Sequence, residues 1–298
     1  MKSRVIALVV ALSAGSPPAP HPPTSRADDG PAAEAAKAAG MTAEERKRWS
    51  IRVGDGEGRP ATIGPDPVLR YTNPGVGRVH GGVFLCIVDG RPGAVLTIYK
   101  WFTPYTGFEA ELQSLSTSAV RGHRDGQVAW RSDGPGIAMA DVPEAPPPAP
   151  SAVERLGQMR SIAGDFSGRL LDGRTAATGV GQALRLLPKP LYRHEARDPG
   201  LLDGGLFAFV LGTDPEVFLL LEARQAARGP RWRYGLARMN SDPLRVTHRG
   251  QEVWKVEKVA DRHDPRSPYL SVELPQKPYR PGSPSGDRLG GGEGERAE

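Results

Sequence analysis

The sequence contains very little cysteine and a small apolar share. Cys86 is the single cysteine among 298 residues, so no intrachain disulfide can form and a zinc site built on cysteines is excluded. Cys86 lies in the apolar run VFLCIV, which favours a buried thiol over a reactive one. Hydrophobic residues make up 38% of the chain, against 30 prolines and 37 glycines. The globular part is therefore expected to be shorter than the chain.

Short motifs of the common enzyme classes are also missing. The sequence has no Gly-x-Ser-x-Gly elbow, no Walker loop, no His-Glu-x-x-His motif and no EF-hand. The six histidines show no spacing typical of a metal site. We therefore expect no metal and no cofactor. Because catalytic groups are often far apart in a sequence, the absence of these motifs does not exclude an enzyme.

The charge pattern contains no run of five like charges. Net charge is +5, and the arginines are dispersed, which makes nucleic acid an improbable partner. An anionic envelope polymer or glycan is the alternative partner, although a solvated basic face explains the same residues. The basic residues considered for such a partner are Arg231, Arg233, Arg238, Arg245, His248 and Arg249.

The N-terminus has the form of an export signal. Lys2 and Arg4 precede a short apolar run, Val5–Leu12, and small residues follow. The run is too short for a spanning helix, so the mature chain is expected to have no transmembrane segment. Export to the periplasm, the cell surface or the medium is the predicted localisation.

Composition then divides the chain into segments. Two patterns typical of capping boxes, Thr42–Glu45 and Ser151–Glu154, predict two helix starts, and apolar residues recur at helical spacing from Val153 to Leu170. The expected segments are a signal peptide over residues 1–27 with cleavage between 14 and 27, a disordered leader over 28–41, a first α+β half over 42–140, a proline-rich linker over 141–150, a second α+β half over 151–262 and a disordered tail over 263–298.

The chain is organised around a stretch that occurs twice. Residues 81–100 read as an apolar hairpin, and residues 204–223 repeat it without a gap. Pro65 matches Pro188 and Arg70 matches Arg193 at the same offset of 123 residues. With one inserted residue, Trp130 matches Trp254. Such repetition favours an internal duplication over chance likeness between hairpins.

Both copies of the hairpin are apolar at consecutive positions, which predicts strands covered on both faces. The expected fold is therefore α+β and mostly antiparallel β. It consists of two duplicated halves, each a helix followed by about five strands, packed as one domain with a pseudo-two-fold.

Aromatic residues just after the first hairpin break this repetition. The second copy has Glu222 and Arg224 where the first has Tyr99 and Trp101. Aromatic side chains supply large contact areas that stack on sugars or hold apolar ligands, although they also cap the ends of sheets. The predicted ligand-binding residues are Tyr99, Trp101, Phe102, Tyr105 and Phe108.

Three residues are weaker catalytic candidates. Glu222 ends the apolar run VFLLL, and a buried carboxyl must be paired or protonated, with Arg193 or Arg224 as partners. His80 and Asp203 precede the glycine pairs of the two copies and could meet across a two-fold. A structural ion pair and ordinary loop residues are the simpler explanations.

Two segments, residues 79–102 and 184–224, resemble a group of uncharacterised exported bacterial proteins. They cover about a quarter of the chain. The resemblance implies export and assigns no catalytic residues. The leading hypothesis is a non-enzymatic binding module of the cell envelope. The alternatives are a hydrolase-like or isomerase-like enzyme with a pocket between the halves, and a purely structural surface protein.

Overall fold

The computed structural model describes residues 30–171, 180–194, 198 and 200–276. This part of the chain contains two α-helices and 19 β-strands, and the paired strands are antiparallel. The α+β class with mostly antiparallel sheet is therefore confirmed. We call residues 30–142 the first half and residues 143–276 the second half.

A long hairpin forms the centre of the first half. Asp89 and Gly90 join its two strands with positive φ angles of 50° and 84°, the conformation that tight hairpin turns require. β7 pairs with one edge of this hairpin, and β3 and β4 pair with the other. The strands are β3 (Thr62–Ile63), β4 (Leu69–Thr72), β5 (Arg78–Val88), β6 (Arg91–Thr103) and β7 (Gly107–Ser114).

A helix and a small sheet cover the outer face of this hairpin. Phe84, Cys86 and Leu96 lie on that face and pack with Met41 of the helix and Trp130 of the small sheet. The covering elements are α1 (Pro31–Arg46), β1 (Trp49–Val53), β2 (Arg59–Pro60), β8 (Val120–Arg124) and β9 (Gln127–Ser132).

The second half also has a long hairpin at its centre, with a helix and short strands over the outer face. The hairpin of β14 (Leu201–Leu211) and β15 (Asp214–Arg224) pairs with β16 (Arg231–Arg238) on one side. Met159, Phe207 and Trp232 belong to the core on its outer face. The remaining elements are α2 (Ala152–Gly164), β11 (Phe166–Leu170), β12 (Gln182–Leu186), β13 (Tyr192–His194), β17 (Leu244–His248) and β18 (Gln251–Val256).

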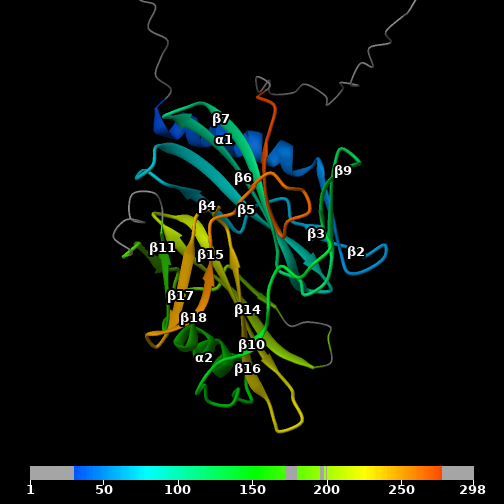
Figure 1. The fold of residues 1–298 in the computed structure, drawn as a ribbon, viewed down its shortest axis with the longest axis vertical. Helices are drawn as coiled ribbons and strands as arrows, with labels where there is room; N and C mark the ends of the chain where they lie inside the picture. The colour runs from blue at the N-terminus through cyan, green and yellow to red at the C-terminus, as the bar shows by residue number, and fades with distance from the viewer. Residues whose placement is uncertain (1–29, 172–179, 195–197, 199, 277–298) are drawn as a thin grey trace, which may run out of the picture.

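The inner faces of the two hairpins pack against each other. Val83 and Leu85 of β5 share a buried core with Leu206 and Phe218 of the second half. Because successive side chains of a strand point to opposite faces, each hairpin is covered on both sides, as its sequence predicts. Figure 1 shows the first half in the upper part of the molecule and the second half below it.

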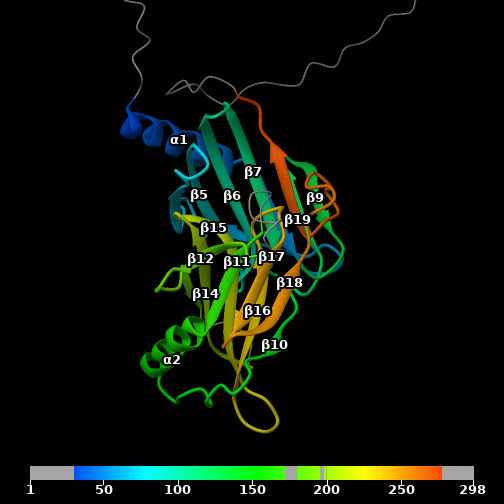
Figure 2. The ribbon, with the colours of Figure 1, turned by 60° about the vertical axis from the view of Figure 1, so that its left-hand side comes forward.

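Two strands are exchanged between the halves. The chain that leaves β9 adds β10 (Ala140–Asp141) to β16 of the second half. The chain that leaves β18 adds β19 (Tyr269–Glu273) to β7 of the first half. Figure 2 shows β19, in orange, beside β7. The sheet of each half is therefore completed by the other half.

The helix of the first half begins earlier than its sequence predicts. The expected leader over residues 28–41 is in large part helical, since α1 starts at Pro31. Thr42 is not the N-cap but is buried inside α1, and its hydroxyl donates to the Ala39 carbonyl at 3.1 Å. Alanine has the highest helix propensity and proline is favoured at a first helical position, which explains this start.

Other boundaries also differ from the prediction. The expected tail from residue 263 contains β19, and the proline-rich linker from residue 141 begins in β10. The helical pattern to Leu170 was wrong beyond Gly164, because Phe166 and Leu170 lie on β11 with alternate residues buried. Over a few residues, the spacing of apolar side chains fits a helix and a strand equally well, and here pairing with neighbouring strands decides for the strand.

Two further findings concern membrane helices and Cys86. In the described ranges, no helix is long and apolar enough to cross a membrane. Cys86 is buried, and burial raises the pKa of its thiol to about 12. The predicted export signal lies outside the described residues.

We predict that removal of β19 destabilises the protein. Ending the chain after Arg266 takes Leu270 and Leu274 out of the core of the first half and leaves the edge of β7 unpaired. Burial of two such side chains stabilises by about 3–6 kcal/mol. Urea denaturation measures the loss. The control ends after Gln276 and keeps β19, and equal stability of the two truncated proteins would contradict this role of β19.

Candidate functional site

The predicted aromatic residues do not form one surface. Tyr99 faces the core between the halves, whereas Phe108 faces the outer core of the first half. Trp101 stacks on the exposed Tyr105, with ring centroids 5.1 Å apart. Phe102 lies edge-on to His80 at 5.9 Å. The structure therefore brings Trp101 and Tyr105 together and links Tyr105 to Tyr99 through Glu109, which accepts from both hydroxyls. Phe108 is separated from them.

Glu222 forms a buried ion-pair cluster that joins the halves. Its Oε1 accepts from Nε of Arg91 at 2.6 Å, and its Oε2 accepts from Nε of Arg224 at 2.8 Å. The Nε2 of His194 lies 3.6 Å from Oε1, beyond hydrogen-bond distance. Burial opposes ionisation, but the imidazole and the two guanidinium groups outweigh it and hold the pKa of Glu222 well below its usual value. Glu222 is thus a paired structural anion.

Asp203 is also fully buried and paired. Its carboxylate accepts from Nε of Arg155 at 3.0 Å and from Nε of Arg193 at 2.9 Å. His80 lies on β5 beside Phe102. The carboxylate of Asp203 is occupied by two arginines of its own half, and no contact joins it to His80 within the described residues.

Part of the predicted basic set is neutralised by neighbouring carboxylates. Arg231 donates to Asp141 at 2.6 Å, and Arg249 donates to Asp165 at 3.0 Å. Arg238 is half-buried, and its guanidinium donates to backbone carbonyls. The set therefore does not act as one basic surface.

A second group of carboxyls lies where β7 meets β15. Glu111 accepts from the Tyr269 hydroxyl at 2.7 Å, and Asp214 accepts from the Asn73 amide at 3.4 Å. Burial raises the pKa of Glu111 to about 7 and that of Asp214 to about 8, and the nearby carboxyl of Glu111 adds to the rise at Asp214. Burial also raises the pKa of Glu216. Among the described residues, no group of three or more His, Cys, Asp or Glu side chains could hold a metal.

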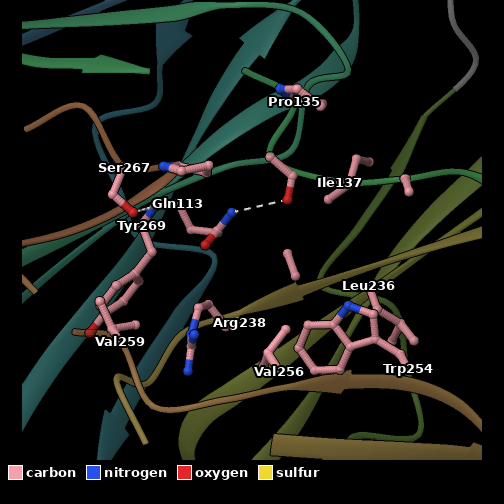
Figure 3. A pocket seen from close by; sticks show the side chains of 14 residues that line it. Gln113, Pro135, Ile137, Leu236, Arg238, Trp254, Val256, Val259, Ser267 and Tyr269 are labelled. Carbon is pink, nitrogen blue, oxygen red and sulfur yellow. Dashed lines mark hydrogen bonds between the residues drawn. The ribbon is translucent and has the colours of Figure 1, made fainter. Parts of the chain in front are cut away.

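A pocket of about 330 Å³ lies at the junction of the halves. It opens between β7, β16 and β18, and the two connections that lead into the exchanged strands form its sides (Figure 3). Its walls are mainly apolar, with Trp254, Val256 and Leu236 facing Ile137 and Tyr269. This volume is at the small end of the range of about 300–1,000 Å³ found for ligand sites.

Gln113 of β7 supplies a buried polar group to this pocket. Its side chain extends toward the middle of the pocket in Figure 3 and is only 2% exposed. Its Nε2 donates to the carbonyls of Ser114 at 2.8 Å and Gly136 at 3.4 Å. These two carbonyls fix the amide orientation, since a flipped amide would set oxygen against oxygen. Oε1 then has no donor among the described residues.

Arg238 of β16 supplies the charge on the pocket wall. Its three nitrogens donate to the backbone carbonyls of Asn240, Asp242 and Glu257 at 2.7–3.0 Å. The guanidinium lies 5.8 Å from the centre of the Tyr269 ring. No carboxylate of the described residues lies within ion-pair distance, and burial lowers the pKa of the group. The wall therefore carries a positive charge that is solvated by carbonyls and a ring, and the carboxylate of Asp242 acts on it beyond ion-pair distance.

Trp254 differs in its surroundings from Trp130, its counterpart in the sequence repeat. Trp130 is fully buried, and its Nε1 donates to the Ser267 carbonyl at 2.8 Å. Ser267 belongs to the connection 257–268, which is longer than the connection 133–139 on the other side. Trp254 is half-buried, faces the pocket and makes no hydrogen bond within the described part of the chain.

Comparison of the chain with protein-family models, with curated protein sequences and with solved structures finds no match.

Sequence reasoning did not select the residues of this pocket. Trp254 was considered only as the match of Trp130, Arg238 only as a member of the basic set, and Gln113 was not considered. The repeat held a usable signal, because Gln113 matches Ala237 at the offset of 124 and so marks a difference between the halves. The connections 133–139 and 257–268 could not be placed over the pocket from the sequence.

We predict that Glu222→Gln destabilises the protein by about 3–5 kcal/mol, because Arg91 and Arg224 lose a buried counter-charge. Chemical denaturation measures the change. Asp89→Asn is the matched control, since Asp89 pairs with Arg59 at the surface and such pairs contribute about 0–1 kcal/mol. Equal effects of the two substitutions would contradict a structural role for Glu222.

We also predict that stability falls between about pH 5 and pH 8. The folded protein keeps protons on Glu111 and Asp214, whose usual pKa values are 4.5 and 3.8, after the unfolded chain has released them. Raising the pH through this window therefore favours unfolding. Glu111→Gln is expected to reduce the loss by about 1–3 kcal/mol.

Urea denaturation at about pH 5, 6.5 and 8 measures this effect. Glu57→Gln is the control, because Glu57 is exposed. The prediction fails if Glu111→Gln keeps the pH dependence of the unsubstituted protein.

Proposed function

We propose that this chain is a non-enzymatic, exported binding module that holds a small ligand in the pocket between its halves. The observation that carries the proposal is the junction pocket itself, with the half-buried Trp254 on one wall and an unpaired amide oxygen of Gln113 inside it. A buried acceptor without a donor costs about 1–3 kcal/mol, which a bound donor would recover. A purely structural protein would gain nothing from this arrangement.

Binding is favoured over catalysis by the state of the candidate carboxylates. Glu222 and Asp203 are each held by two arginines, so neither is available as a general acid or base. Enzyme function has one supporting observation, since Tyr269 lines the pocket and donates to Glu111, whose pKa is raised to about 7. Glu111 itself does not line the pocket, which makes an enzyme the second candidate.

Export is proposed from the sequence of residues 1–27. Helix α1 begins at Pro31, after the cleavage window of residues 14–27, so removal of a signal would leave α1 complete. N-terminal sequencing of protein recovered from the envelope and the medium tests this. A chain that keeps Met1 and stays in the cytoplasm would exclude it.

We further propose that the two halves arose by duplication and pack about a pseudo-two-fold. At an offset of 123 residues, the β4–β5–β6 sheet falls on β13–β14–β15, and the strands pair in the same order. Backbone hydrogen bonds recur as well. The matching bonds are Leu115 N to Gly93 O with Met239 N to Glu216 O, and Val142 N to Trp232 O with Leu274 N to Phe108 O.

The bonds of Val142 and Leu274 are reciprocal, because in each a backbone N–H of one half donates to a carbonyl of the other half. Strands β10 and β19 occupy equivalent edges in the same reciprocal manner. This is what a domain-swapped homodimer would give after fusion of its two chains. An experimental structure in which the paired hairpins superpose by a rotation far from 180° would contradict the two-fold.

The binding function is tested by a screen of small-molecule fragments, glycans and envelope polymers against the full chain. We expect Trp254→Ala to weaken a pocket ligand by at least about 10-fold, because it removes one aromatic wall. Trp101→Ala is the matched control, since Trp101 is also half-buried and stacks on Tyr105. Ligand-observed NMR or calorimetry gives the affinities.

The opposite outcome, with binding lost in Trp101→Ala and kept in Trp254→Ala, would move the site to the aromatic residues after the first hairpin. Circular dichroism of both variants verifies that they are folded.

A further inference from the structure

The chemistry of the junction pocket restricts what it can hold, and the following inference rests on the binding function proposed above. We propose that the pocket takes a small aromatic molecule that offers one N–H or O–H donor and carries no positive charge. The donor would reach Gln113, the ring would lie against Trp254, and the guanidinium of Arg238 would exclude cations.

The need for a donor follows from Gln113. Both hydrogens of its amide are directed to carbonyls, of Ser114 and Gly136, so the group that remains for a ligand is the acceptor Oε1. A ligand atom with lone pairs but no hydrogen would repel this oxygen. A ligand N–H or O–H would satisfy it, and a site with a buried polar group rejects analogues that leave the group unpaired.

The aromatic body follows from the walls. The pocket exposes more apolar than polar surface, and Trp254 presents a half-buried indole to it. A flat ring can stack on that indole in an offset geometry. The opposite side is formed by Ile137 and by the ring of Tyr269, whose hydroxyl is already engaged by Glu111.

The charge preference follows from Arg238. Its guanidinium is surrounded by three carbonyls and one aromatic ring. The carboxylate of Asp242 acts on it through space but is itself paired with Lys258 at 3.5 Å. The carboxyls of Glu111, Asp214 and Glu216 on the neighbouring strands have raised pKa values, so they offset this charge weakly near neutral pH. A cation placed beside Arg238 is repelled, whereas a neutral or anionic ligand is not.

The test uses indole and benzofuran as a matched pair of probes. They have the same shape, but the ring N–H of indole is an oxygen in benzofuran and cannot donate. Calorimetry with the full chain is expected to give at least about 5-fold tighter binding of indole. In Gln113→Leu the acceptor is absent, and the ratio of the two affinities is expected to fall to about 1.

Charge is tested with tryptamine and indole-3-acetate, which add a cation or an anion to the same ring. We expect indole-3-acetate to bind more tightly than tryptamine, and less so at high salt. Tighter binding of tryptamine would overturn the charge preference. These comparisons need no substitution, so they decide the question even where Gln113→Leu fails to fold.

The outcomes separate this inference from the proposed function. Equal binding of indole and benzofuran in the unsubstituted protein would overturn recognition of a donor and leave the pocket as a binding site. Binding of other fragments through Trp254, with no binding of any indole probe, would overturn the ligand class. Absence of any ligand whose affinity depends on Trp254 would overturn the binding function of the pocket as well.

Discussion

Each of the two long hairpins is apolar on both faces and must therefore be covered twice. The outer face of each is covered mainly by a helix and short strands of its own half. The inner faces pack mainly against each other and form the third core, which contains Val83, Leu85, Leu206 and Phe218. Neither half can bury its hairpin alone, so the two halves form one folding unit.

The exchanged strands have the same consequence. A sheet edge with unpaired N–H and C=O groups invites pairing with another chain. Here β19 occupies the edge of β7, and β10 occupies part of the edge of β16. The connections that lead to these strands then run over the junction. The longer connection, 257–268, covers Trp130, whereas the shorter connection, 133–139, leaves Trp254 facing a pocket.

The junction carries two different electrostatic environments. Around Glu222 two arginines hold an ionised carboxylate, whereas around Glu111 and Asp214 the carboxyls lack such partners and favour the protonated form. At the offset of the proposed duplication, 123 residues, Arg91 matches Asp214 and Tyr99 matches Glu222. These differences in charge at matching positions of the two hairpins give the junction one charged end and one neutral end.

Several features follow from the sequence alone. The hairpins and their burial on both faces are local consequences of apolar runs, and these predictions are confirmed. The turn of the first hairpin is likewise local, because it depends on the positive φ angles of Asp89 and Gly90. The start of α1 at Pro31 was also encoded locally, in an alanine-rich segment that its composition made look disordered. Gly164 likewise marked the end of α2, after which Phe166 belongs to a strand.

The tertiary structure alone decided which side chains meet. Gln113, Arg238 and Trp254 come from three strands and carry no motif, and they share a pocket only because β7, β16 and β18 converge at the junction. Glu222 and Asp203 were visible in the sequence, but their roles depended on arginines 2 to 131 residues away. Propensity and periodicity act over a few residues, whereas a site is made by contacts between distant segments, and those are set by the packing of the two halves.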